Sequence, residues 1–145
     1  MSKQVLADYP PLIGLFDTHS HPNDSRFDED REDVFARMRQ TEMLSVCVGA
    51  DMASSRESVE LAKREPMYYA SVGVHPHDAK DFTEADVPVL TEWLTTEEKV
   101  VALGEIGLDY YYDLSPRDVQ KDVFARQLAL AYDCLLYTSP SPRDI

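Results

Sequence analysis

The sequence contains only two cysteines among its 145 residues. Cys47 stands inside an apolar run and Cys134 lies near the C-terminus. A disulfide framework or a thiolate metal cage needs more cysteines, at closer spacings. Both kinds of structure are therefore excluded, and we expect two free thiols.

Basic residues are also scarce. Lys and Arg together number 14 against 27 Asp and Glu, which gives a formal net charge of -13 at pH 7. A surface of this charge repels polyanions unless bound cations or a local patch intervene. A protein that coats nucleic acid without specificity is therefore excluded.

Long apolar segments are missing as well. No run approaches the roughly 20 residues that span a bilayer, and the first residues lead into no apolar core of a secretory signal. We expect a cytoplasmic protein with no membrane partner. With 43% hydrophobic and 28% charged residues, the composition is typical of one soluble globular domain.

What the sequence does contain is an alternation of short apolar runs and amphipathic stretches. Strands are expected over residues 12–16, 44–50, 67–74 and 99–103, and helices over 28–40, from Ser54 or Ser55 to Pro66, over 84–95, and from a cap at 115–118 through Val119, Phe124, Leu128 and Ala131. Four successive β/α units predict a parallel sheet, with Val46, Val48, Val72, Val74, Val101 and Leu103 among its residues. No Gly-x-Gly-x-x-Gly follows the first strand, and the pattern leaves open a small doubly wound domain or part of a barrel.

Residues 134–145 differ from the rest of the chain. They interrupt an amphipathic helix in mid-pattern and contain two Ser-Pro dipeptides, and residues 134–144 resemble the translation of a sequencing adapter. We expect residues 1–133 to form the folded part and 134–145 to be a non-native or disordered tail. A natural flexible tail is the alternative.

Polar side chains with metal-binding chemistry follow three of the expected strands. His19 and His21 are two residues apart at the end of the first strand, so both imidazoles can face one cation, with Asp17 on the same face. His75 and His77 follow the third strand, and Glu105 stands between glycines after the fourth. Taken singly, these are ordinary loop histidines and a solvated acid. Three successive strand ends instead favour a functional rim, because parallel β/α proteins build their sites there.

These motifs together resemble the TatD-type metal-dependent deoxyribonucleases. The similarity rests on residues 17–21, 27–31, 73–79, 104–110 and 117–128, and extends over 12–133. It implies a truncated (β/α)8 TIM barrel with about four N-terminal β/α units. It also implies a hydrolase of the exonuclease type that cleaves phosphodiester bonds in DNA with two divalent metal ions, Mg, Mn or Zn.

The resemblance assigns roles by position. His19 and His21 match ligands of one metal, Glu105 matches a carboxylate shared by both metals, and His75 matches a histidine that faces the substrate, with His77 beside it as a second substrate-binding residue. Single-stranded DNA ends are expected to stack on aromatics such as Tyr110, Tyr111 or Tyr112. No obligate protein partner is implied.

Two features of the family have no counterpart in this chain. The family's further histidines and its late aspartate, which serves the attacking water, are absent, since all four histidines are already assigned. We therefore expect the general base and remaining ligands in a missing C-terminal half, and no activity from these 145 residues alone. The alternatives are a hydrolase of another ester or amide and a non-catalytic metal-binding fragment whose sheet edge associates with other chains.

Overall fold

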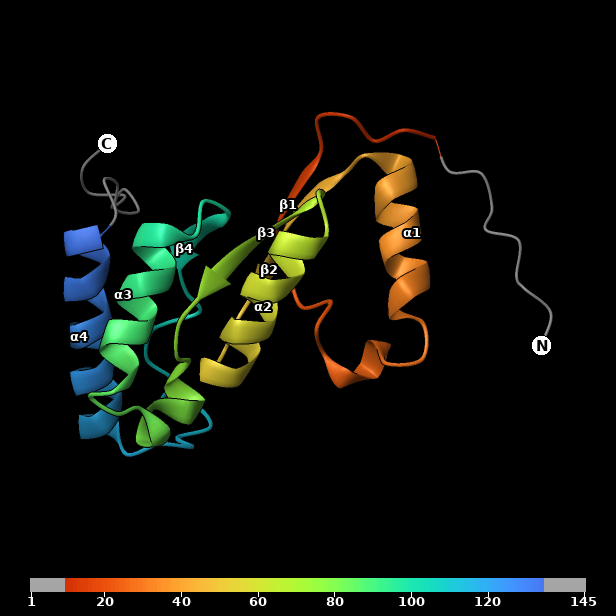
Figure 1. Cartoon of the computed structure of the whole chain (residues 1–145). Coiled ribbons are helices and arrows are strands. Elements are labelled where there is room, and N and C mark those ends of the chain that lie inside the picture. The colour runs from red at the N-terminus through yellow and green to blue at the C-terminus, as the bar shows by residue number, and fades with distance from the viewer. Residues whose placement is uncertain (1–9, 135–145) are drawn as a thin grey trace, which may run out of the picture.

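The structure, a computed structural model, describes residues 10–134. Four parallel strands form one sheet in the order β1-β2-β3-β4 (Figure 1). The strands are β1 (Phe16–Ser20), β2 (Leu44–Val48), β3 (Tyr68–Val72) and β4 (Val100–Leu103). The helices are α1 (Arg31–Thr41), α2 (Met52–Arg64), α3 (Asp86–Thr96) and α4 (Arg117–Cys134), with 3-10 turns η1 (Ser25–Phe27) and η2 (Pro76–Asp81). The predicted parallel β/α architecture is confirmed.

The core lies where the helices cover one face of the sheet. Apolar side chains of α2 and α3 pack on β3 and β4 in one buried cluster: Val59, Ala62, Ala70, Val72, Leu90, Trp93, Leu94 and Val100. A smaller cluster of Phe35, Cys47, Leu61 and Tyr68 joins α1 and α2 to β2 and β3. Helices α3 and α4 run side by side at the β4 side of the sheet (Figure 1). This packing holds the four strand ends at one rim.

The first strand starts later than predicted. Residues 12–15 form a turn, in which Leu15 N–H donates to Leu12 O (3.0 Å) and Gly14 takes a positive φ of 88°. A side chain at Gly14 would be strained in this conformation. The strand is Phe16–Ser20, which places His19 within β1 and His21 directly after it.

The sequence suggested that Ser54 or Ser55 begins helix α2, but the N-cap residue is Asp51. Ser54 N–H donates to Asp51 Oδ1 (2.7 Å) and Asp51 N–H donates to Ser54 Oγ (3.0 Å), so the two residues form a capping box. The Ser55 hydroxyl is engaged elsewhere, because it donates to Gly73 O and accepts from Gly73 N–H. The helix ends at Arg64, ahead of Pro66 as predicted.

Helix α4 forms where the sequence predicted it, and polar residues share its buried face. Gln120, Val123 and Gln127 are its buried residues, Val119, Phe124 and Ala131 are half-buried, and Leu128 is 48% exposed. The Gln127 amide pairs with both backbone groups of Val74, accepting from its N–H (2.8 Å) and donating to its O (2.9 Å). Val74 is therefore not a sheet residue, because Gln127 takes the place of a neighbouring strand.

The predicted tail lies outside the described residues except for Cys134, the last residue of α4. Cys47 and Cys134 are free thiols, as predicted. None of the helices between residues 10 and 134 is long and apolar enough to cross a membrane.

Candidate metal centre

The three predicted metal ligands converge at the carboxyl end of the sheet. His19 Nε2 lies 3.1 Å from His21 Nε2 and 3.7 Å from Glu105 Oε2. One ligand atom from each residue lies within 4.8 Å of the others. His19 is exposed, while His21 and Glu105 are half-buried. The three side chains thus lie together at one end of the sheet, as their positions at strand ends predicted.

A backbone carbonyl orients the His21 ring. The carbonyl oxygen of Val48, at the end of β2, lies 2.9 Å from His21 Nδ1. Since a carbonyl only accepts, Nδ1 carries the proton and Nε2 presents its lone pair toward His19 and Glu105. A neutral imidazole in this tautomer is a ready metal ligand.

Backbone hydrogen bonds place Glu105 at the end of β4. Gly104 N–H donates to Val72 O (2.9 Å), and Glu105 N–H donates to Gly49 O (3.0 Å). The Gly104–Glu105 peptide bond is cis. The close approach depends on Gly73, where a Cβ atom would lie 3.0 Å from the Ile106 side chain and 3.1 Å from the Gly104 carbonyl carbon. The glycine therefore lets the Glu105 segment lie against β3.

The donor set fits a divalent ion. Two imidazole nitrogens bound to one ion at roughly 2.0 to 2.1 Å lie about 3 to 3.5 Å apart, and the His19 and His21 nitrogens are 3.1 Å apart. Imidazole with carboxylate suits zinc and related metals. The cluster opens into a cleft of about 410 Å³, whose lining includes Thr18, His19, Ser71 and Glu105.

Asp17 does not join this cluster. Its carboxylate instead accepts a hydrogen bond from the His19 backbone N–H (3.0 Å). The pairing of β1 with β2 is irregular between Asp17 and Ser20, so the simple alternation of faces does not extend along the whole strand. Asp17 was predicted to share the face of the two histidines, but its carboxylate is not part of the His19, His21 and Glu105 cluster.

His75 presents the opposite tautomer to His21. Its Nδ1 accepts a hydrogen bond from the His77 backbone N–H (3.1 Å). In the neutral ring the proton therefore lies on Nε2, which is 3.7 Å from Glu105 Oε1. Burial lowers the pKa of His75, although the Glu105 carboxylate acts in the opposite direction. His75 is thus a neutral hydrogen-bond donor at the edge of the cluster.

His77 points away from the cluster and pairs with a carboxylate. Its Nε2 donates to Asp109 Oδ2 (2.8 Å). Burial raises the pKa of Asp109, but hydrogen bonds from the Tyr111 backbone and from His77 outweigh this effect and hold that pKa below its ordinary value. His75 and His77 therefore occupy different surroundings, although the sequence presents them as a pair.

Sequence reasoning gave no role to Asp109 or to the two buried glutamines of α4. Gln120 is 1% exposed, and its side-chain amide forms two hydrogen bonds with the backbone of Asp109. It accepts from the Asp109 N–H (2.8 Å) and donates to the Asp109 carbonyl oxygen (3.1 Å). A signal was present, because Gln120 and Gln127 are seven residues apart and so share one face of a helix. Hydrophobic periodicity does not register polar residues on a buried face.

A larger cavity of about 800 Å³ lies between α1 and α2 and shares none of these residues. Its lining includes oppositely charged neighbours such as Arg31 and Asp28, whose side chains are 2.6 Å apart. These charges neutralise each other, and the cavity contributes nothing to the candidate metal centre.

Comparisons with known proteins agree with the motifs. The TatD related DNase family matches residues 16–138. The Bacillus subtilis protein YabD, named an uncharacterized metal-dependent hydrolase, is 45% identical over 118 residues, which are 81% of this chain and 46% of YabD. The 3'-5' ssDNA/RNA exonuclease TatD of Dickeya dadantii is 37% identical over 119 residues, which are 81% of this chain and 45% of that protein.

A solved structure supports the fold. The crystal structure of YjjV, a TatD homologue from Escherichia coli K12, superposes with a TM-score of 0.72 at 29% identity and covers 82% of this chain and 48% of YjjV. The chain spans about half the length of the relatives that it matches. Because the family match extends over most of the chain and the motifs, sheet order and superposition agree, the chain belongs to the TatD related DNase family.

Proposed function

We propose that this chain forms the first half of the active site of a cytoplasmic, metal-dependent hydrolase that removes nucleotides from single-stranded ends of DNA. The observation that carries the proposal is the convergence of His19, His21 and Glu105 within 4.8 Å at the carboxyl end of the sheet. The names of the exonuclease relatives support the choice of substrate.

The chain's own residues divide the work of binding. His19 and His21 offer imidazole lone pairs on one side of Glu105, whose Oε2 faces His19 while Oε1 faces His75. His19, His21 and Glu105 would hold one divalent ion, and Glu105, which offers a second oxygen, is the residue that we propose to be shared with a second ion. Such ions would lower the pKa of a bound water, neutralise the phosphate and offset the net charge of -13.

His75 is proposed to hold the substrate phosphate. Its Nε2 carries a proton because Nδ1 is occupied by the His77 backbone N–H. A donor beside the ligand cluster can bond a phosphate oxygen and orient it without competing for the metal. His77 contributes indirectly, since its ring nitrogen is committed to Asp109.

Ligand counting limits what these 145 residues do alone. Two imidazoles and one carboxylate hold a single ion loosely, and a two-metal site needs further ligands and a base for the water. We propose that the whole barrel supplies both. Residues 1–145 by themselves are then expected to bind metal weakly and to cleave nothing measurable.

The test joins this chain to the C-terminal half of the Bacillus subtilis relative YabD to complete a barrel. Labelled single-stranded DNA, duplex DNA, single-stranded RNA and a small amide are incubated with Mn²⁺ or with chelator. We expect metal-dependent shortening of single-stranded DNA from its end, lost in His19→Ala and retained in the matched control Glu29→Gln, which alters an exposed acid outside the site.

Two results would overturn the proposal. Cleavage that resists chelator excludes the metal mechanism, and hydrolysis of the amide without cleavage of nucleic acid supports the alternative substrate class. Robust cleavage by residues 1–145 alone would show that the count of required ligands is wrong.

A further inference from the structure

Two adjacent tyrosines on the loop between β4 and α4 are unusually exposed. Tyr111 is 86% exposed and Tyr112 is 64% exposed. Their ring centroids are 4.7 Å apart and the ring planes are perpendicular. The two rings therefore form an open corner, in which a flat aromatic group can lie on the face of one ring and touch the other with its edge.

The corner is connected to the candidate metal centre by a row of aromatic rings. Tyr112 packs edge-on against His77 with centroids 5.6 Å apart, and His77 packs edge-on against His75 at 4.2 Å. His75 in turn lies 3.7 Å from Glu105. The rings of His75 and His77 therefore lie between the tyrosine corner and a phosphate placed beside Glu105.

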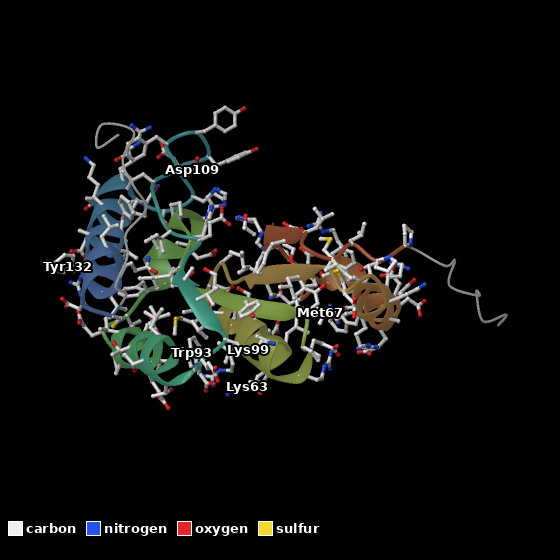
Figure 2. All side chains as sticks on the ribbon, turned by 90° about the horizontal axis from the view of Figure 1, so that it is seen from above. Lys63, Met67, Trp93, Lys99, Asp109 and Tyr132 are labelled. Carbon is white, nitrogen blue, oxygen red and sulfur yellow. The ribbon has the colours of Figure 1, made fainter. Side chains whose placement is uncertain are left out.

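Asp109 holds the corner in place. Its carboxylate accepts hydrogen bonds from the backbone N–H groups of Tyr111 (3.2 Å) and Tyr112 (3.3 Å) as well as from His77 (2.8 Å). Its own backbone is fixed by the buried Gln120. Figure 2 shows Asp109 on the side of the molecule opposite Trp93 and Lys63.

Tyr110 already has a partner on one face of its ring. The Arg117 guanidinium lies over its ring at 4.6 Å and is held by Asp113. A cation in this position covers one face of the Tyr110 ring. Tyr110 is also the least exposed of the three consecutive tyrosines, at 41%, so Tyr111 and Tyr112 offer the more open faces to a ligand.

We infer that Tyr111 and Tyr112 bind the unpaired nucleobase next to the scissile phosphate by stacking, and that Asp109 is the positioning residue that orients them. The inference rests on the proposed function and deepens it. Stacking on an aromatic face accepts any base, because every base has a π-face. It requires an unpaired end, since the bases of a duplex are already stacked on each other. The corner thus selects single strands without reading their sequence.

The first experiment measures binding without hydrolysis. An oligonucleotide with a terminal 2-aminopurine is titrated with residues 1–145 in chelator, at high salt to screen the negative charge. We expect the base to be quenched on binding, and we expect the dissociation constant obtained from the titration to rise about tenfold in Tyr111→Leu and in Tyr112→Leu. The matched control is Tyr132→Leu on α4, because Tyr132 is also highly exposed, at 77%, and lies away from Asp109 (Figure 2).

The second experiment measures kinetics in the completed barrel. Tyr111→Leu and Tyr112→Leu are expected to raise KM about tenfold for single-stranded DNA, with little change in kcat, and to leave KM unchanged for the same strand with abasic terminal positions. Asp109→Ala should raise KM for the normal strand in the same way. Asp109→Asn should raise KM less than Asp109→Ala does, since the amide oxygen still accepts a hydrogen bond from a tyrosine N–H group.

The outcomes separate this inference from the proposed function. If quenching depends on the tyrosines but the completed barrel cleaves no nucleic acid, the stacking role is supported and the proposed nuclease function is contradicted. Equal losses on normal and abasic strands, or a loss of thermal stability in place of a change in KM, would overturn the stacking role. So would tyrosine variants that bind and cleave like the unaltered chain.

Discussion

The hydrogen-bond partner of Nδ1 decides which tautomer His21 and His75 each adopt. His21 and His75 both follow strands and both lie near Glu105, yet Val48 O forces a free Nε2 on His21 and the His77 N–H forces a protonated Nε2 on His75. One ring can bind a cation and the other can donate to an anion. Identical residue types therefore contribute opposite chemistry to one rim.

Metal binding is the first prediction at this scale. Glu105→Gln removes the only carboxylate of the His19, His21 and Glu105 cluster, so the affinity of residues 1–145 for Co²⁺ should fall on the order of tenfold or more. The measurement is a titration followed by the visible absorption of the bound ion. Glu29→Gln is the control, and equal affinities in the two variants would remove Glu105 from the site.

Tyr68 supplies a prediction about pH. Burial raises the pKa of Tyr68 to about 12, whereas an unfolded tyrosine ionises near pH 10. The raised value means that the stabilising contribution of the neutral ring is fully present below about pH 10 and is lost as the pH rises toward about 12. Tyr68→Phe abolishes this alkaline loss.

The test compares urea unfolding at about pH 8 and about pH 11. Between these values the unaltered chain should lose roughly 1 kcal/mol more free energy of unfolding than Tyr68→Phe does. Tyr132→Phe, which changes an exposed ring, should behave like the unaltered chain. Parallel pH profiles for both variants would show that burial of Tyr68 does not affect its ionisation.

Among the helices, the ends differ in how their backbone groups are satisfied. Helix α2 begins with the capping box of Asp51 and Ser54, whereas Asp30 at the start of α1 makes no side-chain cap hydrogen bond. The two aspartates hold the same position relative to their helices. They therefore form a matched pair for measuring the value of the cap.

Asp51→Ala should reduce the free energy of unfolding by about 1 kcal/mol, because a backbone donor of α2 loses its partner. Asp30→Ala loses only the interaction with the helix dipole, worth a few tenths of a kcal/mol. Urea unfolding of both variants measures the difference. A larger effect at Asp30 would contradict the assignment of the capping box.

At the scale of the whole molecule, the two edges of the sheet govern its association with other chains. Within residues 10–134, β1 pairs only with β2 and β4 pairs only with β3. Phe16 on β1 is 46% exposed and Val101 on β4 is 45% exposed. Strands with unpaired backbone and apolar side chains associate with other chains, while the net charge of -13 opposes association.

We predict that residues 1–145 elute from a sizing column as oligomers, and that added salt strengthens association by screening the charge. Val101→Lys should shift the chain toward monomer, since a lysine on an edge strand disfavours pairing. Ala53→Lys, which adds the same charge on the exposed side of α2, should not. A monodisperse monomer that unfolds cooperatively would show that the described strands are not exposed edges.

Local pattern alone determined much of this protein. The apolar runs and helical periodicity predicted the β/α order, because each element is specified by residues that are neighbours in sequence. The strand-end rule brought His19, His21 and Glu105 to one rim, because parallel strands share a carboxyl edge. The motifs around them identified the family.

Tertiary structure decided what depends on distant partners. Gln127 bonds to Val74 across 53 positions and so joins α4 to the segment that follows β3. His77 and Asp109 are 32 positions apart, and their pairing orients the tyrosine loop. Such hydrogen bonds form only when packing brings the groups together, so no local periodicity encodes them. The residue types at the site were readable from the sequence. The tautomer of His21 depends on the Val48 carbonyl of the neighbouring strand, and the position of Asp109 depends on Gln120 of α4, so both follow from tertiary packing.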